Sequence, residues 1–157
     1  MRITRPILLG AALVLSAAAA LAQDAPAGFC SELKQVVALA LSKDRFASIA
    51  GEAREGNFND TTLPLPGWQD CSLYGTTAYT CDSEGFGSAE DAGQVQATLA
   101  DKILSCFAGT WLEIKDRSSP GYVVLNPARG PASMTLSIDE NDKREAIVRL
   151  TLFVRRN

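Results

Sequence analysis

Clustered carboxylates are the residues of this chain that come closest to a catalytic set. Two carboxyl groups flanking a glycosidic bond can hydrolyse it without histidine. The candidate acids are neighbours in the sequence: Asp82, Glu84, Glu90 and Asp91, or Glu52 and Glu55. Acids at a helix start usually serve the helix dipole, and acids in loops are usually solvated. We therefore predict no catalytic residue and keep a carboxylate-only hydrolase acting on cell-envelope glycan as the alternative function.

Histidine is absent from the chain. This removes the commonest general acid–base group and the commonest metal ligand, and it excludes Ser-His-Asp and Cys-His catalysis. Ser31 and Lys34 match the Ser-x-x-Lys nucleophile motif of serine β-lactamases, but the Ser-Asp-Asn and Lys-Thr-Gly motifs that accompany it are missing. We interpret both residues as part of a solvated helix face.

No metal site is predicted. Zinc would require Cys-x-x-Cys pairs or histidine, and the chain has neither. Two groups of polar side chains could bind calcium loosely: Asp82, Glu84 and Glu90, or Asp139, Asn141 and Asp142. Neither group has the spacing of an EF-hand loop, so we interpret both as polar turns and expect no metal and no cofactor.

Aromatic side chains are the candidates for a binding surface, because amphipathic rings are enriched at interfaces. Trp68 follows Pro-Gly in a predicted loop, and Tyr74 lies on the outward side of a predicted hairpin. We predict these two as candidate binding residues. Trp111 opens a predicted strand, which favours a place in the core.

The first 22 residues have the three parts of a secretory signal peptide: Arg2 and Arg5, an apolar run over 7–20, and the small-x-small sequence at 20–22. We expect cleavage before Gln23. The apolar run is shorter than the about 20 residues that span a membrane, so no membrane span remains after cleavage. The alanine-rich composition is typical of bacteria. The predicted location is the periplasm, with secretion as the alternative.

The mature chain, residues 23–157, is 135 residues long and fits a single domain. Losing Arg2 and Arg5 changes the net charge from −3 to −5. Phosphate backbones and anionic lipids repel such a protein, and no Lys/Arg cluster of the nucleic-acid-binding kind is present. We expect the partner to be an envelope protein or a glycan rather than a nucleic acid. The oligomeric state stays open.

Two helices are predicted from apolar residues at helical spacing. The first begins at Phe29 and ends near 42–45, or continues as a second piece to Gly51. The second follows Ser88, a hydroxyl N-cap, and ends near Gly109. Its expected buried stripe is Ala92, Val95, Leu99, Ile103 and Cys106.

Strands are predicted from alternating side chains: a hairpin over 71–81 with its turn at 75–77, and runs at 111–115, 121–125, 134–138 and 148–154. The stretch 51–62 is expected to be loop or ragged edge strand. The element order is α-β-β-α-β-β-β-β, and no internal sequence repeat is visible. This order favours an α+β fold, with two helices packed on one face of a mostly antiparallel sheet.

All four cysteines lie in the mature chain, and an even number in an exported protein implies two disulfides. Of the three possible pairings, hairpin geometry favours Cys71–Cys81, because opposed Cβ atoms lie about 4.5–5.5 Å apart. Cys30, which opens the first helix, then pairs with Cys106, which closes the second. A disulfide-braced frame without a complete catalytic motif is typical of a non-catalytic binding or protein-interaction module. Its expected surface is the exposed side of the sheet with the Pro-Gly-Trp loop.

Overall fold

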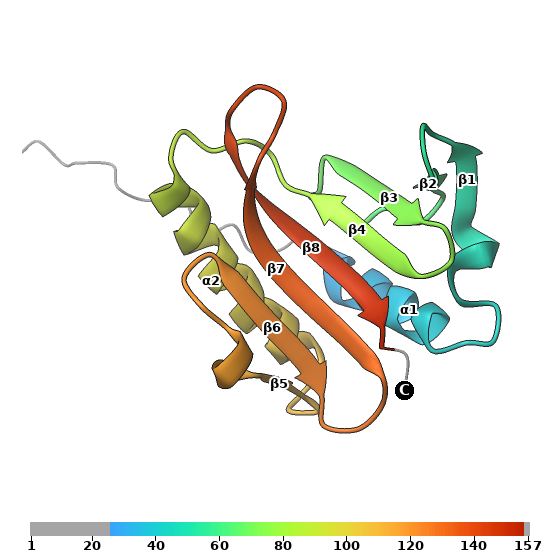
Figure 1. Ribbon diagram of the computed structural model, residues 1–157. Coiled ribbons are helices and arrows are strands. Elements are labelled where there is room, and N and C mark those ends of the chain that lie inside the picture. Colours follow the sequence, from blue (N-terminus) through green and yellow to red (C-terminus); the bar gives the residue numbers. More distant parts are fainter. Residues whose placement is uncertain (1–25, 156–157) are drawn as a thin grey trace, which may run out of the picture.

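A computed structural model describes residues 26–155 of the chain (Figure 1), so the predicted signal peptide lies outside the described residues. Helices α1 (Phe29–Ala40) and α2 (Ala89–Cys106) pack on one face of an eight-stranded antiparallel sheet. The strands lie in front of both helices in Figure 1. This two-layer α+β architecture confirms the predicted fold class. Within residues 26–155, no helix is long and apolar enough to cross a membrane.

The strands form two consecutive meanders. They are β1 (Ala50–Ala53), β2 (Phe58–Thr61), β3 (Asp70–Tyr74), β4 (Ala78–Asp82), β5 (Trp111–Glu113), β6 (Tyr122–Pro127), β7 (Ala132–Glu140) and β8 (Ala146–Val154). The order in the sheet is β1-β2-β3-β4-β8-β7-β6-β5. The predicted element order is confirmed, and the stretch expected to be loop or edge strand forms two short strands, β1 and β2.

The two halves of the chain repeat one arrangement. Each half is a helix followed by a four-strand meander, and the last strands of the halves, β4 and β8, pair at the centre of the sheet. Thr80 faces Thr151 at the middle of this pair. The strand order is the same when read inward from either edge of the sheet, so an approximate two-fold axis through this point relates β1–β4 to β5–β8.

The apolar face of helix α1 is buried and includes Phe29, Leu33 and Ala40. A short 3-10 helix, Arg45–Ile49, adds Phe46 and Ile49 to the same core. The helical spacing of the apolar residues also predicts Leu41 on the buried face of the first helix, but α1 ends at Ala40 and Leu41 is half exposed. The chain therefore continues the apolar pattern in a second helical piece, which was one of the two alternatives predicted.

The buried stripe of α2 is rotated from the predicted one. Gln96 and Ala100 are buried, whereas Val95 and Leu99 are only partly buried. The Gln96 amide donates a 2.8 Å hydrogen bond to the Leu136 carbonyl of β7. A polar side chain can occupy the buried stripe because this bond satisfies it, while the larger apolar side chains pack at the margin.

Both predicted disulfides are present. Cys71 and Cys81 face each other on β3 and β4, with Leu73 opposite Tyr79 in the predicted register. Their Cα atoms are 4.0 Å apart. Cys30–Cys106 joins the start of α1 to the end of α2, with a Cα separation of 5.3 Å. This second bond links the two halves of the chain.

Candidate functional site

The face of the sheet opposite the helices, called the open face below, carries side chains in three rows that cross the strands. Alternate residues of each strand point away from the helices, and the antiparallel registers align them. An aromatic row holds Phe58, Tyr74, Ala78, Phe153, Ser133, Asn126 and Leu112. A hydroxyl row holds Asp60, Ser72, Thr80, Thr151, Thr135 and Val124. A charged row holds Asp70, Asp82, Arg149, Ser137 and Tyr122.

The hydroxyl row has an unusual pattern of hydrogen bonds. At its centre the Thr80 hydroxyl lies 2.9 Å from the Thr151 hydroxyl and donates to the Leu150 carbonyl at 3.1 Å. Ser72 and Thr135 flank this pair, one on each side, and are only 6% and 7% exposed. Neither hydroxyl has a protein partner within residues 26–155, and no buried side-chain oxygen in this range is left unpaired, so both oxygens reach the surface. Because these two hydroxyls reach the surface and have no protein partner, they are available to a ligand.

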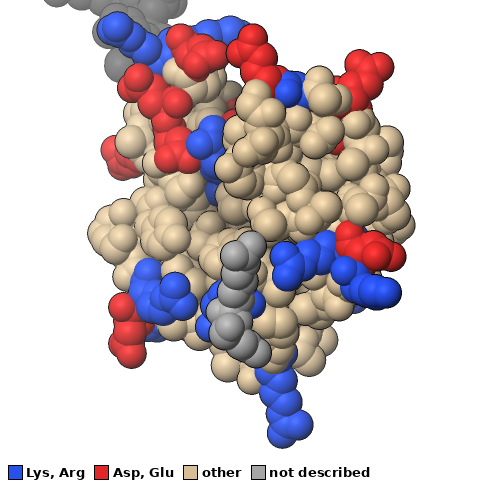
Figure 2. All heavy atoms as spheres, turned by 45° about the vertical axis from the view of Figure 1, so that its right-hand side comes forward, with Lys and Arg blue, Asp and Glu red and all other residues tan. Residues whose placement is uncertain are grey.

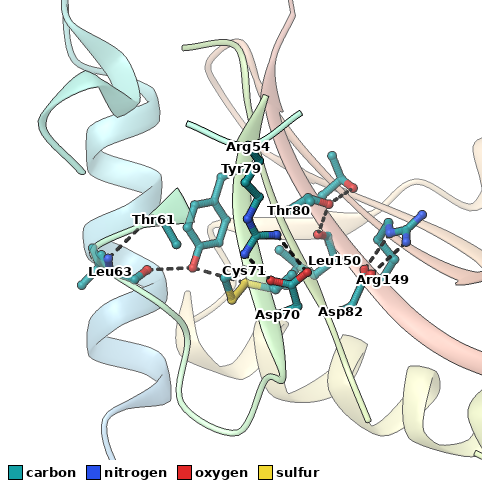
Figure 3. The surroundings of a disulfide bond; sticks show 12 residues. Arg54, Thr61, Leu63, Asp70, Cys71, Tyr79, Thr80, Asp82, Arg149 and Leu150 are labelled. Atoms are coloured by element: carbon teal, nitrogen blue, oxygen red, sulfur yellow. Dashed lines mark hydrogen bonds and ion pairs between the residues drawn. A yellow bond between two sulfur atoms is a disulfide. The ribbon is translucent and has the colours of Figure 1, made fainter. Parts of the chain in front are cut away.

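The charged row is held by two arginines that each bridge two carboxylates. Arg54 of the first half donates to Asp60 and, at 2.8 and 3.1 Å, to Asp70. Arg149 donates to Asp82 at 2.6 and 2.8 Å and lies 3.1 Å from Asp139. Figure 3 shows both arginines beside the Cys71–Cys81 hairpin.

These contacts favour the charged forms of the groups that make them. The hydrogen bonds from Arg54 lower the pKa of Asp70. Hydrogen bonds to the carboxylates raise the pKa of Arg54 and of Arg149. Both guanidinium groups are therefore fully charged and neutralised by carboxylates, with two arginines facing four aspartates. The row has an excess of negative charge and offers no unpaired cation.

Exposed apolar side chains gather on the open face. Five large apolar residues are exposed in the described part of the chain, and only Leu41 lies elsewhere; the other four are Phe58, Tyr74, Leu112 and Tyr122. The rings of Phe58 and Tyr74 meet edge to face at 5.2 Å. The helix-covered face, by contrast, presents fully buried side chains such as Leu73, Tyr79 and Leu150.

The two candidate binding residues lie apart. Tyr74 is half exposed on the open face, as expected for its side of the hairpin. Trp68 is partly buried against the core, in a segment in which Leu65 is buried and the Leu63 carbonyl accepts a 2.8 Å hydrogen bond from Tyr79 (Figure 3). Tyr79 belongs to the helix-covered face, and burial raises the pKa of its hydroxyl. The Pro-Gly-Trp segment thus packs on the helix side, away from Tyr74.

Sequence reasoning missed Phe58, Leu112, Ser72 and Thr135. Phe58 lies in the stretch expected to be loop or edge strand, so no strand face was assigned to it. Ser72 alternates with Cys71 and Leu73 in the sequence, so it shares the outward side of the hairpin with Tyr74, and this alternation was the available signal. Trp111 is buried and stacks on Phe107 at 4.9 Å, in keeping with a core role.

The candidate carboxylates have structural explanations. Asp82 pairs with Arg149, and the Ser88 hydroxyl accepts the Asp91 amide at the start of α2. The remaining four acids are exposed: Glu52, Glu55, Glu84 and Glu90. Asp70 faces Asp82 across two strands, but Asp70 is held ionised by Arg54, whereas a glycosidase general acid needs a raised pKa.

The side chains that were considered as calcium ligands or as a nucleophile have local structural contacts as well. Among residues 26–155, no group of three or more Asp, Glu, His or Cys side chains is placed to hold a metal ion. Asn141 of the second calcium candidate accepts the Lys143 and Glu145 amides, as in a polar turn. Ser31 is exposed and donates to the Gly28 carbonyl at 2.7 Å.

The fold and the three rows define a two-layer α+β protein with one uncovered sheet face. The chain matches no protein-family model, no curated protein and no solved structure. Function is therefore inferred from the open face itself.

Proposed function

We propose that this chain is an exported binding module and that the open face is its binding surface. The observation that carries the proposal is that four of the five exposed large apolar side chains of the described residues lie on this one face. Phe58 and Tyr74 are in contact in the β1–β4 half of the sheet, and Tyr122 and Leu112 lie in the β5–β8 half. Exposed apolar side chains that share one face favour that face as an interaction surface. Because Trp68 packs on the helix side, the proposed surface does not include the Pro-Gly-Trp segment.

Two features support export to the periplasm. Both disulfides need an oxidising compartment to form and persist, and the first 22 residues have the pattern of a signal peptide. The check is the mass of the protein recovered from a periplasmic fraction. We expect a chain beginning at Gln23 with no free thiol. A full-length chain retained in the cytoplasm would contradict export.

The binding surface is tested with a matched pair of variants. Tyr74→Asp places a charge in the aromatic row, and Leu41→Asp places the same charge at an equally exposed apolar position away from the open face. Each tagged protein is first shown to unfold at the wild-type temperature and is then used to capture components of an envelope extract. We expect Tyr74→Asp to lose the captured component and Leu41→Asp to keep it. Equal capture by both variants would show that the open face is not the surface.

A further inference from the structure

We propose that the open face binds a neutral glycan chain, which lies across the strands along the hydroxyl row. This inference rests on the proposed function and adds the class of ligand. The observations that carry it are two accessible hydroxyls without protein partners, the aromatic rings on both sides of the row, and the pairing of Arg54 and Arg149 with carboxylates.

The hydroxyls form a continuous series. Ser72, Thr80, Thr151 and Thr135 lie on four neighbouring strands, β3, β4, β8 and β7. Adjacent strands are about 4.8 Å apart, so the row presents hydroxyls at a spacing comparable with that of successive sugars in an extended glycan. A hydroxyl both donates and accepts, as sugar hydroxyls do. Ser72 and Thr135 are the two of this series without a protein partner within residues 26–155, and their oxygens reach the surface.

Aromatic rings lie at both ends of this series. Phe58 and Tyr74 lie at one side and Tyr122 at the other, all exposed. Asp60 on β2 and Val124 on β6 are the two ends of the hydroxyl row. Phe58 lies two residues before Asp60, and Tyr122 lies two residues before Val124. The approximate two-fold axis therefore relates Phe58 to Tyr122. Five strand spacings separate β2 from β6, about 24 Å. Rings at these positions can stack on the apolar faces of sugars that lie several units apart.

The charges favour a neutral ligand. Arg54 and Arg149 are each neutralised by two carboxylates, and the row they form has an excess of negative charge. An anionic glycan or a phosphate-bearing polymer would be repelled. Figure 2, in which the β1–β4 side of the molecule comes forward, shows most carboxylates at the top, mixed with some Lys and Arg, then a broad uncharged area, and further Lys and Arg side chains below it.

A polypeptide partner is the less well supported occupant. A peptide laid on a sheet face is held by pockets for its apolar side chains. The buried apolar side chains of this face, Val124 and Ile147, are already covered by the protein itself, and the other deep side chains are small and polar: Ser72, Thr135, Ser133 and Asn126. Ser133 and Asn126 already bond to each other at 2.6 Å. The hydroxyls of Ser72 and Thr135 are still free to form hydrogen bonds, and they lie apart from each other. This arrangement suits a ligand that has many hydroxyls of its own.

The experiment measures binding of neutral hexasaccharides to the disulfide-bonded mature protein by calorimetry. The probes are the hexamers of β-linked N-acetylglucosamine, β-linked glucose, α-linked glucose, mannose and xylose, with a galacturonate hexamer as the anionic comparison. We expect at least one neutral hexamer to bind and the galacturonate hexamer to bind more weakly. If no neutral hexamer binds the folded protein, or if galacturonate binds best, the proposal of a neutral glycan is overturned.

Variants locate the site. Ser72→Ala with Thr135→Val should weaken binding about tenfold or more, because two hydrogen bonds are lost. The matched control, Ser105→Ala with Thr98→Val, removes one serine and one threonine hydroxyl from the exposed side of α2 and should bind as the wild type does. Tyr122→Ser, at an exposed position where folding is little affected, should also weaken binding. Unchanged affinity in both open-face variants would overturn the site.

Failure of this inference is distinguishable from failure of the proposed function. An envelope protein whose capture depends on Tyr74 and persists in excess glycan would support the open face as a binding surface. The same result would overturn the glycan as its ligand.

Discussion

The two halves of the molecule share one arrangement but are stabilised differently. In the first half, β3 and β4 have five residues each and are joined by Cys71–Cys81. In the second half, β7 and β8 have nine residues each. The pair equivalent to the two cysteines is Met134 and Leu152, which face each other and are fully buried.

This difference shows where a covalent bond substitutes for packing. A short two-stranded hairpin is marginally stable in water, and β3–β4 supplies only five facing pairs of residues. A disulfide stabilises it by restricting the unfolded chain. The longer β7–β8 hairpin has nine facing pairs and more contact with α2, so buried apolar side chains suffice there. We therefore expect the first half to be the less stable one when Cys71–Cys81 is removed.

The largest expected effect concerns the disulfide that joins the halves. Cys30–Cys106 closes a loop with a sequence separation of 76, and chain entropy assigns such a bond about 4.5 kcal/mol. We expect Cys30→Ala with Cys106→Ala to lower the free energy of unfolding by about this amount in urea titrations. The untreated wild type, with both disulfides formed, is the control, and Cys71–Cys81 is first shown to be intact in the variant. A loss below about 2 kcal/mol would mean that packing, and not this bond, holds the halves together.

The disulfide inside the first half should have a smaller and more local effect. Cys71–Cys81 has a sequence separation of 10, which corresponds to about 2.8 kcal/mol. We expect Cys71→Ala with Cys81→Ala to speed amide hydrogen exchange in β1, β2 and β3 far more than in β5, β6 and β7. Exchange that rises equally in both meanders would show that the two halves unfold as one unit and do not differ in stability.

Much of the fold follows from local pattern. The hairpin register that places Cys71 opposite Cys81 was predictable, because strand side chains alternate and a glycine-containing turn fixes the pairing. Ser88 caps α2 as expected. By contrast, β1 and β2 contain Gly51, Asn59 and Asp60, which are poor strand formers. They are extended because they pair with each other and with β3, which is a tertiary effect.

The open face could be predicted only in part, for a related reason. Tyr74 and its outward direction followed from the hairpin. The alignment of Ser72 with Thr135 depends on the pairing of β4 with β8, whose facing residues lie about 70 positions apart in the chain. Periodicity within a segment carries no information on such a pairing. The repeated order of elements was hidden for the same reason, since the two halves share their topology and not their sequence.

The pairing of β4 with β8, called the seam below, joins the two halves of the molecule. Thr80 and Thr151 meet across β4 and β8, and Thr80 also donates to Leu150. We expect Thr80→Val and Thr151→Val to show a coupling energy of about 1 kcal/mol in a double-mutant cycle followed by urea unfolding. Thr77→Val, in the β3–β4 turn, is the control and should add independently to either variant. Strict additivity of the seam variants would mean that this contact does not join the halves.

The smallest expected effect is the acid sensitivity of the first half, in which Arg54 pairs only with carboxylates of its own meander. The hydrogen bonds from Arg54 lower the pKa of Asp70 below its ordinary value of 3.8. A carboxyl whose pKa is lowered by folding contributes stability that is present above its unfolded pKa and is lost as the pH falls through the folded one. The Asp70 side chain is 54% exposed, so the contribution is small, about 0.5 kcal/mol.

We therefore expect Asp70→Asn to unfold more easily than the wild type at neutral pH and to converge with it as the pH falls below about 3.8. Thermal unfolding measured from pH 7 to pH 2 checks this. Asp101→Asn, at an exposed position of α2 without an ion pair among the described residues, is the control and should follow the wild type throughout. If Asp70→Asn stayed a constant interval below the wild type at every pH, the carboxylate's charge would not be the cause. The Arg54 pairs would then stabilise the first meander no more than an uncharged hydrogen bond does, and Cys71–Cys81 would remain its main support.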